Sequence, residues 1–463
     1  MNSSHKLTGA LKARCPNLRL TTEAEVCARL GKDWSIAPSG RPAAVVWPDN
    51  TDEVVAIVRA ANELGLSLVP SGGRTGLSGG ATAADGEVVV SMDRFNALSS
   101  VQPAGRLIDA GAGVVTAQLQ AQAADDGFFY PVDFASSGSS QVGGNIATNA
   151  GGIRVLRYGM TRDWVAGLEV VTGTGEVLSL GRGLVKDATG PDLKQLMIGS
   201  EGVLGIITQT RMRVTSQPPN QQVVLLALSS IDAVLPLFAA CRRHLQLSAF
   251  EYFSDTCVDY LLNHRDLARP LDDAAEHYVL LEADEDEAAV LALFEHAAEQ
   301  DWVVDGVISQ SKAQAEELWQ YREGISESLA PMRPYKNDVV VPVSEVGRFL
   351  TELDKLVAEQ YPDFSTAWFG HVGDGNLHLN ILPPKGMAHS DFSRECQRVN
   401  ELVFALVDQL GGSISAEHGI GTLKRPYLHH SVSTTEISLL GALKAQLDPN
   451  GILNPGKLIP DHG

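Results

Sequence analysis

Two histidines in one glycine-rich motif have a spacing that could serve a metal ion. His371 and His378 lie seven positions apart within residues 369–380. On a regular strand this odd spacing would place the two imidazoles on opposite faces of the sheet. The segment Gly373-Asp-Gly375 between them favours a hairpin or a bulge, which could bring both side chains together. A single histidine is more often a structural residue, so this interpretation depends on further ligands.

A second glycine-rich motif, residues 413–421, supplies a carboxylate and another imidazole. It contains Glu417 and His418, and three of the twelve histidines of the chain fall inside the two motifs. Two histidines and one glutamate suit a divalent metal with one coordination position open for a substrate. The clustering therefore favours a metal site over three unrelated structural histidines.

Three clusters of small residues could hold phosphates or a flat ligand. The first, residues 70–81, has five glycines in twelve positions after an apolar strand, with Arg74 and Thr75 as added donors. Its exposed backbone N–H groups suit a pyrophosphate, although a mobile surface loop is the alternative. The second, residues 136–152, has little side-chain bulk, so its backbone could lie flat against a large planar group. The third is residues 199–205.

A partial nucleotide-binding motif at residues 111–116 does not indicate a dinucleotide site. Gly111 and Gly113 lie between a predicted strand and a predicted helix, but Thr116 occupies the position of the third glycine. An incomplete fingerprint of this kind is weak evidence for a dinucleotide site. The pattern favours an ordinary turn from strand to helix.

The elements that must position these motifs alternate between helices and strands. Asn50 is a candidate N-cap with Glu53 three residues later, and the apolar spacing that follows predicts a helix to Leu64. Residues 217–222 read as a linker, after which glycine is sparse to about residue 365 and a separate α+β domain is expected. Further strands are predicted at 66–69, 88–92, 107–110, 222–228 and 277–283, and further helices at 115–124, 230–244, 286–299, 313–330 and 434–447.

Net charge and cysteine usage exclude several classes of protein. The 463 residues carry 36 basic and 56 acidic side chains, and a formal net charge of −20 argues against a nucleic-acid binder or a polybasic membrane anchor. No apolar run has the length of a membrane-spanning helix. The five scattered cysteines form no CxxC pair, which argues against disulfides and iron–sulfur ligands and favours a reducing compartment. No signal-peptide core is evident, so we expect a cytoplasmic protein.

The small-residue clusters, together with residues 186–194 and 454–457, resemble the FAD-binding domain of the vanillyl-alcohol oxidase and p-cresol methylhydroxylase (PCMH) family. The resemblance implies an α+β fold with a two-subdomain PCMH-type FAD-binding domain (1–216), a ferredoxin-like α+β substrate domain (217–405) and a small helical C-terminal segment (406–463) that returns to the flavin. No histidine lies in the main flavin loops, which favours non-covalent FAD. The residues it implies for FAD are Ser71, Gly72, Gly73, Arg74, Thr75, Gly76, Ser139, Gly144, Asn145, Thr148, Gly151, Gly202, Ile206 and Asn454.

The two histidine motifs resemble the D-2-hydroxyacid dehydrogenase branch of that family. By this resemblance His371, His378 and Glu417 bind Zn²⁺ or Mn²⁺, and His418 is the catalytic base. The metal would lower the pKa of a 2-hydroxyl group, His418 would take the proton, and hydride would pass from C2 to flavin N5. The adjacent Glu417 and His418 can serve separately as metal ligand and base only where the backbone is irregular, and the neighbouring Gly419 permits such a backbone.

A cation for the substrate carboxylate is expected on the helix near residue 322. Taken alone, Arg322 on a partly apolar helical face could either extend its head group to solvent or clamp a carboxylate. The motif around it resembles the D-2-hydroxyglutarate dehydrogenases, which implies that Arg322 and Ser326 hold the C1 carboxylate, with Lys336 as a second cation and Asn380 as a donor. Ser326 replaces a common threonine and keeps the hydroxyl group.

The sequence leaves the substrate and the electron acceptor open. D-2-hydroxyglutarate or a close D-2-hydroxy acid such as D-malate is the implied substrate, with D-lactate or glycolate as the alternative. A metal-free alcohol or phenol oxidase and a non-enzymatic flavoprotein are the other hypotheses. In the phosphate loop, Ser71 and Arg74 stand where this subgroup often has glutamine and asparagine. The expected acceptor is an electron-transfer flavoprotein, a quinone or a cytochrome, and the family suggests a homodimer.

Overall fold

The chain passes from one folded unit to a second and back, so each unit is built from separate stretches of sequence. The computed structural model describes residues 3–271 and 275–460. Unit 1 contains Met1–Gly152, Gly159–Gln217 and Glu417–Gly463, and unit 2 contains Ile153–Tyr158 and Pro218–Ala416. The outermost residues of the first and last predicted domains, 1–2 and 461–463, lie outside the described residues.

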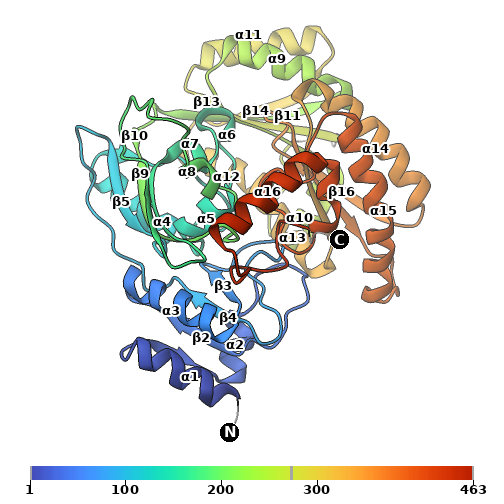
Figure 1. The fold of residues 1–463 in the computed structure, drawn as a ribbon. Coiled ribbons are helices and arrows are strands. Elements are labelled where there is room, and N and C mark those ends of the chain that lie inside the picture. The colour runs from blue at the N-terminus through green and yellow to red at the C-terminus, as the bar shows by residue number, and fades with distance from the viewer. Residues whose placement is uncertain (1–2, 272–274, 461–463) are drawn as a thin grey trace. The chain divides into compact units, whose positions relative to one another are not determined.

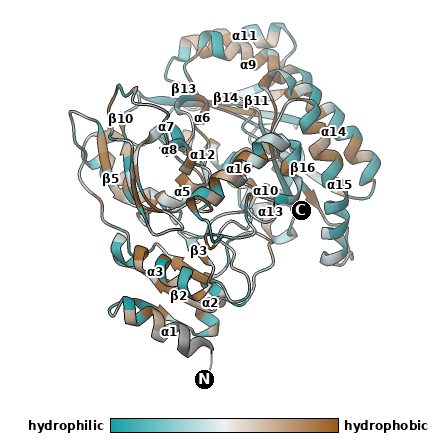
Figure 2. Cartoon of the chain, viewed as in Figure 1, coloured by the Kyte–Doolittle hydropathy of each residue, from teal (hydrophilic) through white to brown (hydrophobic). Residues whose placement is uncertain are grey.

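The first sheet of unit 1 has four strands in the order β1-β2-β4-β3. Its elements are β1 (Arg19–Thr21), β2 (Ala44–Trp47), β3 (Leu68–Ser71) and β4 (Val88–Ser91), with α1 (Ser3–Arg14), α2 (Ala24–Leu30) and α3 (Thr51–Leu64). Strands β2 and β3 both run parallel to β4, and β1 is antiparallel to β2. The Asn50 side chain caps α3 by accepting a hydrogen bond from Glu53 N at 3.0 Å, as predicted. Figure 2 shows both hydrophobic and hydrophilic residues on α3.

The second sheet of unit 1 is antiparallel, in the order β5-β9-β7-β8. Its strands are β5 (Leu107–Gly111), β7 (Val165–Val171), β8 (Val177–Leu180) and β9 (Ile206–Arg213), and β6 (Phe128–Phe129) pairs separately with β10 (Thr215–Ser216). The helices are α4 (Thr116–Asp125), α5 (Val142–Thr148), α7 (Thr161–Trp164), α8 (Lys194–Met197), the 3-10 helix η4 (Arg425–His430) and α16 (Thr434–Leu447). One hydrophobic core includes residues of both sheets, such as Val88 and Val170.

The turn after β5 is closely packed rather than open. A Cβ atom on Gly113 would lie 2.0 Å from Met92 O, and one on Gly111 would lie 2.2 Å from Phe95 O. These glycines therefore allow one backbone segment to pass against another. The ordinary turn predicted for this segment is what the structure contains.

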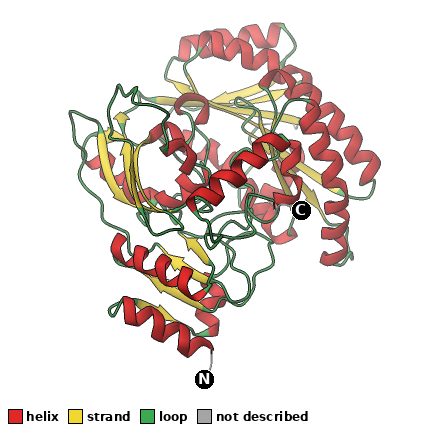
Figure 3. Ribbon diagram, in the orientation of Figure 1, coloured by secondary structure: helices red, strands yellow, loops and turns green. Residues whose placement is uncertain are grey.

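Unit 2 is built on a seven-stranded antiparallel sheet in the order β14-β11-β13-β12-β16-β17-β15. Figure 3 draws the strands in yellow and the helices in red. Its strands are β11 (Gln221–Leu228), β12 (Leu247–Ser254), β13 (His277–Asp284), β14 (Val303–Ile308), β15 (Tyr335–Val340), β16 (Ser365–Gly370) and β17 (Asn376–Leu382). Strands β11 to β14, with α9 (Val234–His244) and α11 (Glu287–Glu299), follow the βαββαβ order of the predicted ferredoxin-like fold.

Different helices cover the two faces of this sheet (Figure 1). On one face, Leu226 lines a small apolar space with Leu237 of α9 and Leu293 of α11. On the other face, Leu225 and Phe253 belong to a core cluster with residues of α10, α12 and α13. The helices not yet given are α6 (Val155–Tyr158), α10 (Asp255–His264), α12 (Lys312–Glu323), α13 (Ile325–Leu329), α14 (Val346–Gln360), α15 (His389–Gln409), and the 3-10 helices η1 (Ile231–Ala233), η2 (Ala330–Met332) and η3 (Val343–Glu345). None of the described helices is long and apolar enough to cross a membrane.

A buried ion pair fastens α16 to the loops of unit 1. Lys444 Nζ lies 2.5 Å from Asp448 Oδ2 and also donates to the carbonyl groups of Val203 and Leu453, at 2.8 and 2.6 Å. The Asp448 carboxylate in turn accepts from the amides of Ile452 and Leu453, at 3.1 and 2.7 Å. Because Asp448 is 1% exposed, its charge depends on Lys444 for compensation.

We expect Lys444→Met to lower the free energy of unfolding by about 3 kcal/mol, because it leaves a buried carboxylate without its cation. Urea denaturation followed by circular dichroism measures the change. The matched control is Lys312→Met, which removes a lysine that is 92% exposed and lies 3.8 Å from Glu316. Equal midpoints for the two variants would contradict the role assigned to Lys444.

Candidate active site

The two predicted metal-binding histidines meet in a hairpin of unit 2. His371 is the first residue after β16, and His378 lies within β17 opposite Phe369. Their ring centroids are 5.3 Å apart with an interplanar angle of 84°, and both side chains are buried. The intervening turn needs Gly375, which has a φ of +86° and whose Cβ atom would lie 2.1 Å from Val341 O. The hairpin predicted from the glycines therefore brings both imidazoles to one place.

Each of these histidines has a buried carboxylate beside its Nδ1 atom. His371 Nδ1 lies 2.7 Å from Glu251 Oε1, and His378 Nδ1 lies 3.5 Å from Asp338 Oδ1. Desolvation would raise the pKa of Glu251, but electrostatic interactions and hydrogen bonds with His371 and Arg322 outweigh it and hold that pKa below its ordinary value. Carboxylates commonly orient metal-binding imidazoles by accepting a hydrogen bond from one ring nitrogen, which leaves the other to bind the metal. His371 and His378 would therefore bind a metal through Nε2.

Arg322 is held inside unit 2 by an internal ion pair. Its Nε atom donates to Glu251 Oε2 at 2.8 Å, and its guanidinium carbon lies 4.8 Å from the centre of the Phe369 ring. Arg322 is 8% exposed, so it does not extend its head group to solvent. Among the described residues, its two Nη nitrogens make no hydrogen bond. The outer edge of the guanidinium group therefore remains able to receive a carboxylate.

The other predicted substrate residues lie in different surroundings. Lys336 of β15 is exposed and is paired across the strands with Asn380 of β17, which is buried. Ser326 is exposed on α13, whereas Ile325 and Leu329 are buried there. Arg322 is likewise buried near the end of α12, which meets α13 at Gly324, so Arg322 and these apolar residues share the inward side of the two helices.

Glu417 and His418 belong to unit 1 and lie on an irregular loop. Gly419 and Gly421 have φ angles of +76° and +52°, which is the irregular backbone that the sequence predicts. His418 O accepts a hydrogen bond from Ser78 Oγ at 2.9 Å, and His418 Nε2 lies 3.8 Å from Glu417 Oε1. The loop that carries the predicted base is thereby tied to the first glycine-rich cluster.

A buried glutamate organises the same loop and was not found from the sequence. Glu201 accepts hydrogen bonds from Ile420 N and Gly421 N at 2.6 and 2.7 Å. Asn454 Nδ2 donates to Gly80 O at 2.9 Å and to Glu201 O at 2.7 Å. Burial raises the pKa of Glu201 to about 7, although the two amide bonds oppose the rise. Its position inside residues 199–205, among small residues, was the available signal.

The first two glycine-rich clusters and Asn454, all in unit 1, contain four buried polar atoms without partners among the described residues. These atoms are Ser71 Oγ, Arg74 Nη1, Gln141 Oε1 and Asn454 Oδ1. Gly73 lets the first cluster approach the second, because its Cβ atom would lie 2.2 Å from Ser139 O. Buried polar atoms normally have a partner, so this group of orphans fits a polar ligand.

The second cluster has a different shape from the flat segment that was expected. Its residues 142–148 form helix α5, in which Asn145 is buried and donates from Nδ2 to Thr116 Oγ1 at 2.7 Å. A Cβ atom on Gly144 would meet nothing within 4 Å, so open space adjoins the helix at that residue. The other predicted ligand-binding residues divide by exposure: Gly151, Gly202 and Ile206 are buried, Gly72, Thr75, Gly76 and Thr148 are half-buried, and Ser139 is exposed.

Two known protein families match most of the chain. The family described as "FAD binding domain" matches residues 42–181, and "FAD linked oxidases, C-terminal domain" matches residues 217–458. The chain is 50% identical over 444 residues to a D-2-hydroxyglutarate dehydrogenase of Stutzerimonas stutzeri (strain A1501), covering 95% of this chain and 96% of that relative. It is 36% identical over 445 residues to a putative mitochondrial D-lactate dehydrogenase of Schizosaccharomyces pombe, covering 92% and 84%.

Solved structures with little sequence identity share the fold. A 4-ethylphenol oxidase from Gulosibacter chungangensis has a TM-score of 0.76 at 17% identity, covering 98% of this chain and 97% of its own. p-Cresol methylhydroxylase has a TM-score of 0.76 at 15% identity, covering 99% and 97%. These similarities confirm the predicted fold class.

The buried Glu201 gives a pH prediction with a definite sign. A carboxyl group whose pKa is about 7 when folded and about 4.3 when unfolded stabilises the folded state at low pH. That stabilisation, on the order of 3 kcal/mol, is lost as pH rises through 7. We expect the melting temperature of Glu201→Gln, relative to the unchanged protein, to rise by a few degrees between pH 5 and pH 8.

The control for this measurement is Glu25→Gln, at an exposed position of α2. Its melting temperature relative to the unchanged protein should stay constant over the same range. A Glu201→Gln difference that is equally constant would show that burial does not control this carboxyl group.

Proposed function

Since the chain belongs to the family of FAD-dependent D-2-hydroxyacid dehydrogenases, we propose that it oxidises D-2-hydroxyglutarate, or a close D-2-hydroxy acid such as D-malate, to the 2-oxo acid. One observation supports this substrate most strongly. Arg322 and His371 share the carboxylate of Glu251, so a carboxylate-binding cation lies beside the imidazoles proposed for a metal. A 2-hydroxy acid presents a carboxylate and a hydroxyl group on neighbouring atoms, which suits this pairing.

The cofactor residues are proposed from the first two small-residue clusters of unit 1 and from Asn454. The orphaned polar atoms of Ser71, Arg74, Gln141 and Asn454 would hold FAD together with the exposed backbone of residues 72–76. Phosphate groups favour backbone N–H donors and arginine, which supports the first cluster for the pyrophosphate. Gln141 is an addition to the residues predicted from the sequence.

His371, His378 and Glu417 are proposed as ligands of Zn²⁺ or Mn²⁺. The carboxylates at the Nδ1 atoms of both histidines support this ligand set, because they leave Nε2 as the ligating atom. When bound, FAD supplies the hydride acceptor and the metal supplies Lewis acidity that lowers the pKa of the substrate hydroxyl group.

The chain's own residues would bind the substrate and move one proton. Arg322 would receive the C1 carboxylate through its outer nitrogens, and the hydroxyl group of Ser326, which is exposed, stays a predicted second donor to it. Lys336 would pair with the second carboxylate of a diacid, and Asn380 would donate a hydrogen bond. His418 would accept the proton of the 2-hydroxyl group, and the tie between its carbonyl oxygen and Ser78 supports a fixed position for this base.

An electron acceptor is needed to reoxidise the flavin. The electron-transfer flavoprotein, quinone or cytochrome expected from the sequence stays a prediction, as do the cytoplasmic location and the homodimer. The five cysteines are buried and form no disulfide with one another.

A steady-state comparison of substrates tests the proposal. We expect kcat/KM for D-2-hydroxyglutarate to exceed that for D-lactate and glycolate by at least tenfold, because only the diacid engages both Arg322 and Lys336. Treatment with EDTA should abolish the activity, and Zn²⁺ or Mn²⁺ should restore it. A tenfold preference for D-lactate or glycolate would contradict the substrate, and full activity in EDTA would favour a metal-free oxidase.

Replacing the proposed base should slow the chemical step. We expect His418→Gln to lower kcat by 10²- to 10⁴-fold, as is typical when a general base is lost. The visible spectrum of the bound flavin should be unchanged, which separates loss of the base from loss of the cofactor. The control is His244→Gln, at an exposed position. A reduction of less than tenfold for His418→Gln would exclude this histidine as the base.

A further inference from the structure

We propose that Glu251 is a positioning residue, whose single carboxylate aligns the metal-binding imidazole of His371 with the carboxylate-binding guanidinium group of Arg322. This inference rests on the proposed function, because it concerns the same two residues. It adds a third residue, which neither the sequence motifs nor the similarity to relatives identifies.

The carboxylate of Glu251 is buried and has a different partner on each oxygen. Oε1 lies 2.7 Å from His371 Nδ1, and Oε2 lies 2.8 Å from Arg322 Nε. The Glu251 side chain is 1% exposed, and strand β12 is hydrogen-bonded to β13 on one side and to β16 on the other. Strand pairing on both sides therefore fixes the backbone of Glu251 independently of its side-chain contacts with His371 and Arg322.

For His371, the hydrogen bond determines which ring nitrogen can bind a metal. A proton on Nδ1 that is donated to Glu251 leaves Nε2 as the atom with an available electron pair. The negative charge on the carboxylate also makes the imidazole a stronger ligand. Without Glu251 the ring could rotate or exchange its proton between nitrogens, and metal affinity would fall.

For Arg322, the same carboxylate restricts the plane of the guanidinium group. Nε is occupied by Glu251, and the Phe369 ring lies 4.8 Å from the guanidinium carbon. The two Nη nitrogens then form a fixed edge, which can receive a carboxylate through two parallel hydrogen bonds. Because the Glu251 charge offsets that of Arg322, the main contribution of the arginine is to orient the substrate carboxylate. The charge of a dianionic substrate must then be balanced mainly by Lys336 and the metal.

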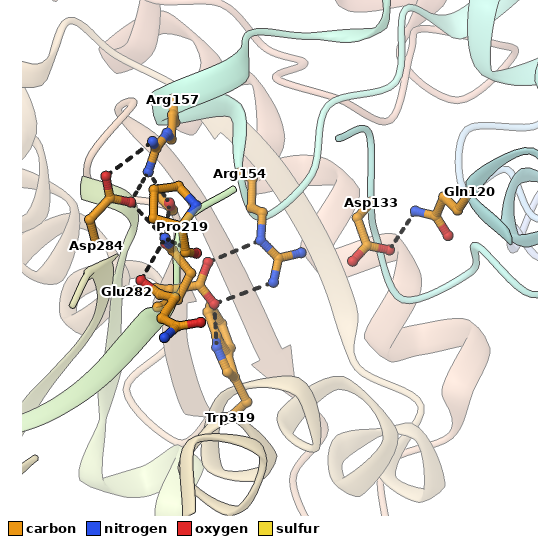
Figure 4. A network of polar contacts seen from close by, with 11 residues as sticks. Gln120, Asp133, Arg154, Arg157, Pro219, Glu282, Asp284 and Trp319 are labelled. Atoms are coloured by element: carbon orange, nitrogen blue, oxygen red, sulfur yellow. Dashed lines mark hydrogen bonds and ion pairs between the residues drawn. The ribbon is translucent and has the colours of Figure 1, made fainter. Parts of the chain in front are cut away.

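A second buried glutamate in the same sheet has a structural role only and can serve as a control for Glu251. Glu282 of β13 is 4% exposed and accepts from Trp319 Nε1 at 3.1 Å and from Arg154 Nε at 3.0 Å (Figure 4). Trp319 lies on α12, three residues before Arg322, so both glutamates anchor the same helix. Within the described part of the chain, Glu282 makes no hydrogen bond or ion pair with a proposed metal or substrate residue, which makes it the matched control.

The experiment compares Glu251→Gln with Glu282→Gln in the FAD-loaded protein. Zn²⁺ affinity is measured by competition with a coloured chelator, and KM and kcat are measured with D-2-hydroxyglutarate. We expect Glu251→Gln to weaken Zn²⁺ binding by 10- to 100-fold and to raise KM by at least tenfold. Glu282→Gln should lower the melting temperature while leaving Zn²⁺ affinity and KM within twofold of the unchanged protein.

The outcomes separate this inference from the proposed function. If the unchanged protein binds no Zn²⁺ and does not oxidise D-2-hydroxyglutarate, the proposed function fails, and the inference fails with it. If the unchanged protein does both and Glu251→Gln matches it, or if Glu282→Gln reduces Zn²⁺ affinity equally, only the positioning role is overturned. Should Glu251→Gln not fold, Glu251→Asp keeps the charge but shortens the reach. Unchanged Zn²⁺ affinity and KM in that variant would also overturn the proposal.

Discussion

The buried charge of Glu251 is the constraint on which the arrangement of unit 2 depends. A carboxylate on an apolar sheet face costs several kcal/mol unless charged partners satisfy it. Arg322 supplies the charged partner from a helix, and His371 supplies a hydrogen bond from the turn after β16. The same two groups that make the buried charge tolerable are the groups proposed to bind a hydroxy acid and a metal.

Buried acids also organise the loops of unit 1. Glu201 accepts two amides of the loop that carries His418, and Asp448 accepts two amides beyond the C-terminal helix α16. Glycine-rich segments have few side chains of their own to pack, so their backbone N–H groups need fixed acceptors from elsewhere. A strongly acidic chain can thus place part of its negative charge inside the fold as hydrogen-bond acceptors.

The shared fold and the specific chemistry rest on different residues. The solved structures that share this fold include a 4-ethylphenol oxidase at 17% identity, so the fold itself does not determine a substrate. The hydroxyacid chemistry proposed here depends on polar side chains of β12, β15 and β17 and of the hairpin turn, among them His378, Asp338 and Asn380. These residues project from one face of the unit 2 sheet, opposite the face covered by α9 and α11.

The sequence by itself determined the local elements and the motifs of this protein. The Asn50 cap and the glycine turn between His371 and His378 follow from spacing and from backbone freedom, which act over a few residues, whereas the ferredoxin-like substrate domain was implied by the family resemblance. Only the tertiary structure decided that Glu251 joins His371 to Arg322, since those contacts span 120 and 71 positions of the chain. Local spacing carries no information about partners so distant, because strand register and helix docking bring them together. A lone glutamate inside an apolar strand was the one available sign that such partners exist.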